Sequence, residues 1–186
     1  MNKLIKAMKP FNNCKRCGLH RYRRKIVWGR GEVPARILFI GEAPGKSEDA
    51  LGKAFVGPSG RLLSLAMEKA REIAGLRSIP SYYISNVCAC RPTDEASGPN
   101  RQPSPEEALA CWPRLSVLYD IVKPRSVVFL GRVAETYCKE AFPAGVHLPH
   151  PAYILRLGGE SSTQYRTFCR DLAEVYKSTR RIRRIG

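Results

Sequence analysis

Three short, mostly apolar runs constrain the fold of this 186-residue chain more than any other feature, and two of them stop at a glycine. Residues 35–40 are followed by Gly41 and residues 125–130 by Gly131, while residues 82–87 form the third run. Runs of this length without polar alternation are typical of strands that are buried on both faces of a parallel sheet.

Helical patterns separate these runs, so strands and helices alternate along the chain. The expected helices open at Ser59 as N-cap and near Ser104, and cover residues 132–141 and 161–177; a short fourth strand covers residues 146–148. This order predicts an α/β fold, a three-layer α/β/α sandwich around a central, mainly parallel four-stranded sheet.

The composition excludes two broad classes of protein. Apolar residues make up 44% of the chain and charged residues 26%, which is the balance of a globular protein and not of a disordered one. No apolar run approaches the roughly 20 residues that a membrane span needs. The N-terminus lacks the apolar core and cleavage site of a secretory signal. We therefore expect one domain over residues 1–186, monomeric and intracellular, in the cytoplasm or nucleoid.

The charge points to a polyanionic partner. The chain has 32 Lys and Arg against 16 Asp and Glu, a net charge of +16. The N-terminal segment, residues 1–31, is basic, and the tail over residues 178–186 adds four arginines. Phosphates gain from neutralisation by such charges, so nucleic acid is the leading candidate partner. A solvated basic face or a flexible tail explains these C-terminal arginines equally well.

Seven cysteines cannot all pair, and in an intracellular chain clustered thiols indicate metal or redox chemistry. Cys14 and Cys17 form a C-x-x-C pair within the basic segment, which is compatible with a redox pair or with half of a metal site. A metal site needs further ligands, for which the candidates are Cys88, Cys90 and Cys111.

The predicted topology also places a polar site. Ligands of parallel sheets bind beyond the carboxyl ends of the strands. Glu42, Asn86 and His150 lie in the loops at those ends, and Phe55 follows close by. A carboxylate, an amide, an imidazole and an aromatic ring suit a planar ligand that forms hydrogen bonds.

Residues 41–47 are similar to a phosphate-binding loop, but the spacing fails. The phosphate loop requires four residues between its glycines, whereas Gly41 and Gly45 are separated by three. An NTPase is therefore a minor alternative.

Six motifs in register resemble the family 4 uracil-DNA glycosylases, the iron-sulfur branch of that superfamily. The similarity runs from about Cys14 to Arg156 and into the last helix. The motifs are Cys14-x-x-Cys17, Gly41-Glu42-Ala43-Pro44-Gly45, Gly52-Lys53-Ala54-Phe55-Val56-Gly57, Asn86 leading to Cys90-Arg91-Pro92, Pro105-Glu106-Glu107 leading to Cys111, and His150-Pro151-Ala152-Tyr153. Family members usually carry proline at the position of Ala54, so the loop before Phe55 is expected to be less rigid here.

By this resemblance, Cys14, Cys17, Cys90 and Cys111 hold a four-iron four-sulfur (4Fe-4S) cluster. Four thiolates suit iron-sulfur or zinc, so the choice of iron rests on the resemblance alone. Cys90 is preferred to Cys88 because it precedes an Arg-Pro pair as in the family.

The resemblance implies a DNA repair glycosylase that flips uracil out of DNA and hydrolyses its N-glycosidic bond, leaving an abasic site. The reacting groups would be Glu42, near the sugar, and His150, as a donor to uracil O2. The base would be bound beside Gly41, stacked on Phe55 and paired through N3–H and O4 with the Asn86 amide. Glu48 would exclude the methyl group of thymine.

DNA contacts are expected on two segments. Ser59 and Gly60, at a helix N-terminus, would hold a phosphate through backbone N–H groups. Tyr153 and Arg156 lie in the loop that the superfamily inserts into the minor groove. The alternative function is a noncatalytic iron-sulfur or zinc nucleic-acid-binding module, which would bind ordinary and uracil-containing DNA alike.

Overall fold

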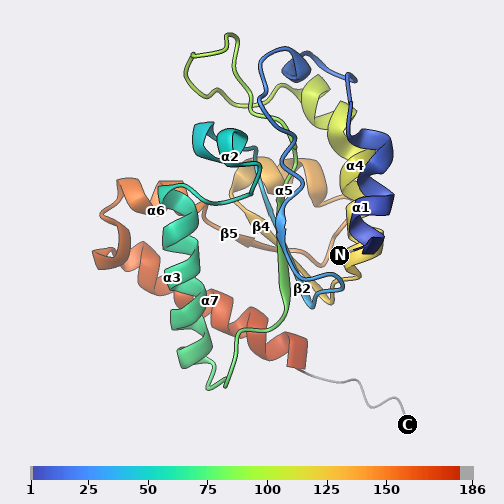
Figure 1. The fold of residues 1–186 in the computed structure, drawn as a ribbon. Coiled ribbons are helices and arrows are strands. Elements are labelled where there is room, and N and C mark those ends of the chain that lie inside the picture. Colours follow the sequence, from blue (N-terminus) through green and yellow to red (C-terminus); the bar gives the residue numbers. More distant parts are fainter. Residues whose placement is uncertain (1, 181–186) are drawn as a thin grey trace.

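The computed structural model describes residues 2–180 and is built around one five-stranded sheet (Figure 1). The strands are β1 (Arg30–Gly31), β2 (Ile37–Gly41), β3 (Tyr82–Asn86), β4 (Ser126–Leu130) and β5 (Val146–Leu148), in the order β1-β3-β2-β4-β5. Only β1 runs antiparallel to its neighbour. The predicted mainly parallel sheet is confirmed, with β1 as a fifth strand that is too short to give a sequence pattern.

Seven α-helices and three short 3-10 helices complete the described fold. The α-helices are α1 (Asn2–Met8), α2 (Lys46–Leu51), α3 (Pro58–Ile73), α4 (Pro105–Val122), α5 (Arg132–Cys138), α6 (Pro151–Arg156) and α7 (Thr163–Arg180). The 3-10 helices cover Lys9–Phe11, Gly18–Arg21 and Gly159–Ser161. Of the predicted basic tail, residues 178–180 end α7, and residues 181–186 lie outside the described part of the chain.

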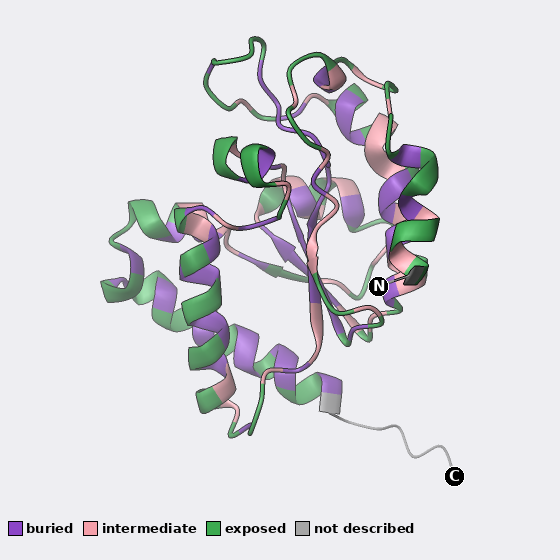
Figure 2. Cartoon of the chain, in the orientation of Figure 1, coloured by how far each residue is buried: buried purple, intermediate pink, exposed green. Residues whose placement is uncertain are grey.

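Helices cover both faces of the sheet, which gives the predicted three layers. Side chains alternate across the strands, so Phe39 packs with α3 and α7 on one face while Leu38 packs with α1, α4 and α5 on the other. Both cores are fully buried, and the burial follows the inner surfaces of the helices (Figure 2). No helix within residues 2–180 is long and apolar enough to span a membrane.

The ends of the helices fit the sequence with one correction. The helix expected near Ser104 is α4. Ser104 is its N-cap and accepts from the Glu107 N–H, while the Glu107 carboxylate accepts from the Ser104 N–H. The expectation that Ser59 is the N-cap of α3 is wrong. Gly57 is the N-cap and Pro58 is the first residue of the helix, where a proline loses no hydrogen bond because that N–H is unpaired in any helix.

Candidate active site

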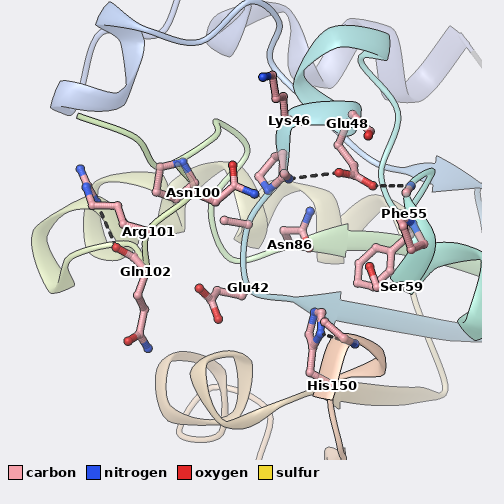
Figure 3. Close-up of a pocket in the computed structure, with 18 of the residues that line it drawn as sticks. Glu42, Lys46, Glu48, Phe55, Ser59, Asn86, Asn100, Arg101, Gln102 and His150 are labelled. Atoms are coloured by element: carbon pink, nitrogen blue, oxygen red, sulfur yellow. Dashed lines mark hydrogen bonds between the residues drawn. The ribbon is translucent and has the colours of Figure 1, made fainter. Parts of the chain in front are cut away.

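A cavity of about 590 Å³ opens at the carboxyl ends of β2 and β3, beside α6 (Figure 3). The register aligns Gly41 with Asn86, so the two strands end level and their following loops share one opening. The lining includes eight of the predicted site residues: Glu42, Glu48, Phe55, Ser59, Asn86, His150, Tyr153 and Arg156. Gly41 and Gly60 support the lining from behind and do not form part of it.

Asn86 is the buried polar group that this pocket leaves unpaired. The residue is 2% exposed, and its Oδ1 has no hydrogen-bond partner within residues 2–180. Gly41 leaves the room for it, because a Cβ at position 41 would lie 2.5 Å from Asn86 Oδ1 and 2.7 Å from Phe55 Cζ. An unpaired buried carbonyl costs about 1–3 kcal/mol, so this amide is suited to a donor brought by a ligand.

Phe55 presents its ring to the pocket from an unusual backbone. Its φ is +54°, a left-handed conformation that non-glycine residues seldom adopt. Arg30 holds this backbone, with Nε donating to the Ala54 carbonyl at 2.9 Å and Nη2 to the Phe55 carbonyl at 3.4 Å. The ring lies 5.8 Å from that of His150, centroid to centroid.

Glu48 fixes the loops around the ring. Its Oε1 accepts from the N–H groups of Val56 at 2.9 Å and Gly57 at 2.8 Å, and its Oε2 accepts from Gly45 at 3.1 Å. The side chain is 9% exposed. The carboxylate therefore joins the start of α2 to the loop that carries Phe55.

Glu42 and His150 both line the cavity, and burial shifts their pKa values in opposite directions. Burial raises the pKa of the Glu42 carboxyl. Burial, and secondarily the charge of Arg156, lowers the pKa of His150 to about 4, so the imidazole is neutral near pH 7. His150 Nδ1 accepts from the Ala152 N–H at 3.1 Å and caps α6. The neutral ring therefore carries its proton on Nε2.

The predicted DNA-binding residues lie on the rim or behind it. Ser59 is half-buried in the first turn of α3. Gly60 is buried, and a Cβ there would overlap the Phe55 carbonyl. Tyr153 on α6 is 46% exposed, and the Arg156 guanidinium lies 5.9 Å from its ring centroid.

The sequence matches the profile of the Uracil DNA glycosylase superfamily over residues 28–173, a range that includes the sheet and the pocket. The chain belongs to the uracil-DNA glycosylase superfamily. The predicted α/β fold agrees with this membership.

Relatives named Type-4 uracil-DNA glycosylase are similar to this superfamily member. The protein of Pyrobaculum aerophilum is 39% identical over 131 residues, 70% of this chain and 62% of the relative. That of Sulfurisphaera tokodaii is 39% identical over 137 residues, 74% and 58% of the two chains. That of Thermotoga maritima is 41% identical over 124 residues, 67% and 59%. The matches span less than two thirds of these relatives, and their names confirm the resemblance to family 4.

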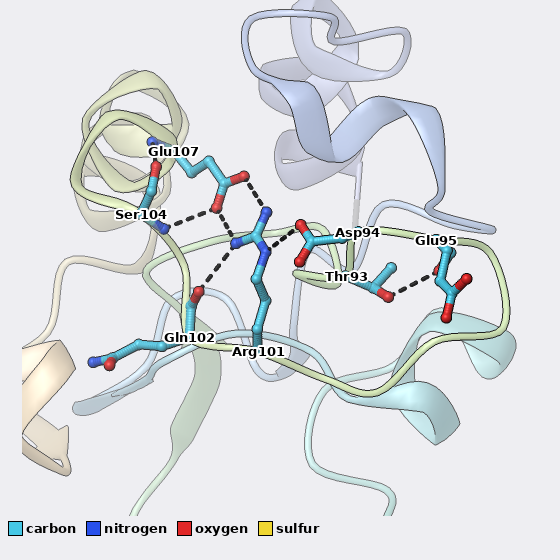
Figure 4. A network of polar contacts seen from close by, with 7 residues as sticks. All are labelled: Thr93, Asp94, Glu95, Arg101, Gln102, Ser104 and Glu107. Carbon is cyan, nitrogen blue, oxygen red and sulfur yellow. Dashed lines mark hydrogen bonds and ion pairs between the residues drawn. The ribbon is translucent and has the colours of Figure 1, made fainter.

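The loop before α4 forms a further wall of the cavity, which the sequence did not predict. Asn100 and Gln102 line it from the long loop before α4. Arg91 Nε donates to Asn100 Oδ1 at 2.6 Å, and Arg101 binds the carboxylates of Glu107 and Asp94, each at 2.7 Å (Figure 4). Long-range contacts from an irregular loop leave no periodic signal, so only the Arg and Asn residue types could have suggested this wall.

The predicted metal ligands share one environment. Burial chiefly raises the pKa of Cys17, and the nearby thiols of Cys111 and Cys14 raise it further. Burial raises the pKa of Cys90 to about 11 against the opposing charge of Arg23, and Cys111 and Cys17 add to the increase. No group of three or more Cys, His, Asp or Glu in the described chain is already arranged around a metal position. The donor chemistry of these four thiols fits a thiolate-ligated centre.

Cys88 also lies close to the predicted ligand set. Both Cys88 and Cys90 are buried, and both follow the end of β3 at Asn86. The neighbouring Cys111 thiol, together with burial, raises the pKa of the Cys88 thiol. Cys88 is thus a neighbour of the predicted ligands.

Proposed function

We propose that this chain is a DNA repair enzyme, a uracil-DNA glycosylase that hydrolyses the N-glycosidic bond of a flipped-out uracil and leaves an abasic site. The observation that carries the proposal is the unpaired, buried Asn86 amide oxygen, which lies in the same cavity as Phe55, Glu42 and His150. Membership of the superfamily and the Type-4 names of the relatives support it.

Uracil fits the chemistry of this cavity. Asn86 Oδ1 would accept from uracil N3–H and its amide N–H would donate to O4, whereas cytosine reverses both demands. Phe55 would stack on the base from its fixed left-handed backbone. Gly41 would allow the base close to the strand end. Glu48 would exclude thymine by holding the loop from Gly45 to Gly57 tight around ring carbon 5.

The bond between C1′ and uracil N1 breaks with its electron pair going to N1, so positive charge develops on the sugar and negative charge on the base. Glu42, as a carboxylate, would stabilise the sugar cation and orient the water that adds to C1′. His150 would donate its Nε2–H to uracil O2, where the negative charge gathers. The hydrogen bond from the Ala152 N–H to Nδ1 supports this tautomer.

DNA would bind across the rim of the cavity. The N–H groups of Ser59 and Gly60 lie in the first turn of α3, where a phosphate is favoured. Tyr153 and Arg156 on exposed α6 would enter the minor groove and fill the space left by the flipped nucleotide. The substrate is uracil-containing DNA, and the enzyme acts as a monomer inside the cell.

Cys14, Cys17, Cys90 and Cys111 would hold a 4Fe-4S cluster. When bound, the cluster would cross-link the basic N-terminal segment to the loop after β3 and to helix α4, and base hydrolysis requires no redox step. Zinc would suit the same thiolates, so iron and sulfide analysis of the purified protein decides between them.

An excision assay tests the function. Duplexes with one uracil, or with thymine at the same position, are incubated with the wild type and with Glu42→Gln, and abasic sites are read as alkali-sensitive breaks. Glu32→Gln, an exposed glutamate outside the cavity, is the matched control. We expect breaks at uracil alone, retained in Glu32→Gln and lost in Glu42→Gln. Equal binding of both duplexes by folded protein without breaks would support the noncatalytic module instead.

A further inference from the structure

Arg114 is a buried cation that connects α4 to the end of β3. It is 2% exposed. Its Nη1 donates to Ser85 Oγ at 2.9 Å, and its Nη2 donates to the carbonyls of Asn86 and Val87, each at 2.7 Å. The same Nη2 lies 3.6 Å from Cys111 Sγ. The guanidinium therefore contacts both the backbone of the proposed base-reading residue and a proposed metal ligand.

No carboxylate balances this charge. Among the described residues, no ion pair with Asp or Glu involves Arg114, and its Nε has no hydrogen-bond partner. The ionisable groups that face it are the thiols of Cys88, Cys111 and Cys138 and the phenol of Tyr83. A guanidinium stays charged in proteins, and a buried charge without a counter-charge is strongly destabilising.

A thiolate-ligated metal centre would supply the missing negative charge at Cys111. We propose, on the basis of the glycosylase function inferred above, that Arg114 is a positioning residue that couples the cysteine centre to base recognition. It is the buried counter-cation of that centre, and it fixes the two carbonyls at which β3 ends. The centre and the Asn86 amide thereby share one support.

Arg23 provides a matched comparison. Its Nη1 donates to Cys90 Sγ at 3.5 Å, so it also places a cation beside a proposed ligand. Arg23 is half-buried and makes no hydrogen bond to β3. Removing Arg23 changes the charge near the centre without touching the support of Asn86, whereas removing Arg114 changes both.

The test compares intact Arg114→Met, Arg114→Lys and Arg23→Met proteins with the wild type. Four quantities are measured: iron and sulfide per chain, the midpoint potential of the centre, the affinity for free uracil, and the affinity for abasic DNA. Loss of a nearby positive charge disfavours the reduced centre, so both Met variants should have more negative potentials. Arg114→Met should bind uracil about tenfold more weakly, because hydrogen bonds from a charged group are lost. Its affinity for abasic DNA should be unchanged.

Arg23→Met and Arg114→Lys separate the effect of the positive charge from the effect of the hydrogen bonds to the end of β3. Arg23→Met should keep wild-type uracil affinity. Arg114→Lys keeps the charge and should keep the potential, but a single ammonium does not reproduce the fork across both carbonyls and the sulfur, so uracil affinity should still fall. If Arg114→Met does not fold, the Lys variant alone decides. Wild-type uracil affinity in a loaded Arg114 variant would overturn the proposal. Failure of the glycosylase function itself would appear separately, as a wild type that neither binds uracil nor cuts at it.

Discussion

Glu48 and Asn86 are both buried polar side chains of the pocket, but only Asn86 has hydrogen-bonding capacity left for a ligand. Glu48 accepts three backbone N–H groups and has little capacity left for a ligand. Asn86 is more deeply buried, yet its Oδ1 has no hydrogen-bond partner among the described residues. Unmet hydrogen-bonding capacity at a strand end identifies the residue that a ligand completes, whereas a saturated carboxylate identifies the residue that shapes the site.

The pH dependence of excision follows from the two reacting groups. Glu42 has a raised pKa, so its carboxylate is lost on acidification before that of an ordinary glutamate. His150 has a pKa of about 4 and stays neutral until more acidic pH. We predict an acid limb in the single-turnover rate that belongs to Glu42, and no inflection near the ordinary histidine pKa of about 6.5.

The measurement is the single-turnover rate as a function of pH for the wild type and for Glu42→Gln. The acid limb should be absent from the residual activity of the variant. An inflection near the ordinary histidine pKa of about 6.5 would show instead that His150 acts as a cation.

Sequence reasoning placed the site residues that follow strands and missed those held by irregular contacts. Asn86 and His150 could be predicted because strand ends of a parallel sheet converge. Asn100 and Arg114 could not, because Asn100 depends on Arg91 across a loop and Arg114 depends on carbonyls that become neighbours only in the folded chain.

At the scale of elements, the junction between the Phe55 loop and α3 is the tightest part of the site. Alanine normally stabilises a helix relative to glycine by about 1 kcal/mol, but a Cβ at Gly60 would overlap the Phe55 carbonyl. We predict that Gly60→Ala lowers the free energy of unfolding by about 1–3 kcal/mol and weakens excision. Chemical denaturation and the excision assay measure both effects.

Gly18 is the control for this prediction. A Cβ there would meet no atom within 4 Å, and its φ is not positive. Gly18→Ala should therefore leave stability and excision near wild type. Equal stability of the two variants would contradict the proposed tight junction.

The Arg30 side chain is predicted to keep the Phe55 platform in place. Arg30 lies on β1 and donates to the carbonyls of Ala54 and Phe55. Position 54 is an alanine here, so no rigid proline holds this loop. Arg30→Ala should slow uracil excision about five- to tenfold, which corresponds to about 1 kcal/mol, the typical net value of a hydrogen bond. Arg36→Ala, an exposed arginine next to β2, should have no effect. If the rates of the two variants agree, the left-handed Phe55 backbone does not depend on Arg30.

The length of each element explains which helices and strands could be predicted from the sequence. Strands β2, β3 and β4 are long enough to give recognisable apolar runs, and the helices α3, α4 and α7 are long enough to give a helical period. Helices α2 and α6, with six residues each, and β1, with two, are too short for one. Tertiary contacts form these short elements, and two of them, α2 and α6, border the cavity.

At the scale of the whole molecule, the charge of +16 predicts binding that depends steeply on salt. Each phosphate neutralised contributes a slope of about −0.9 to the logarithm of duplex affinity against the logarithm of salt concentration. We expect equal slopes for uracil-containing and ordinary duplexes, because phosphate contacts do not read the base. Fluorescence anisotropy at several salt concentrations measures them, and a flat dependence would exclude a phosphate-binding rim.

The central claim is that the Asn86 amide reads uracil, and its most direct test is the single-turnover rate of Asn86→Asp on a duplex with one uracil. The variant replaces the N–H that faces O4 with an acceptor, so the rate should fall about 100-fold or more. Asn12→Asp makes the same chemical change at an exposed position outside the cavity and should keep the wild-type rate. A folded Asn86→Asp protein that excises uracil at the wild-type rate would contradict the account.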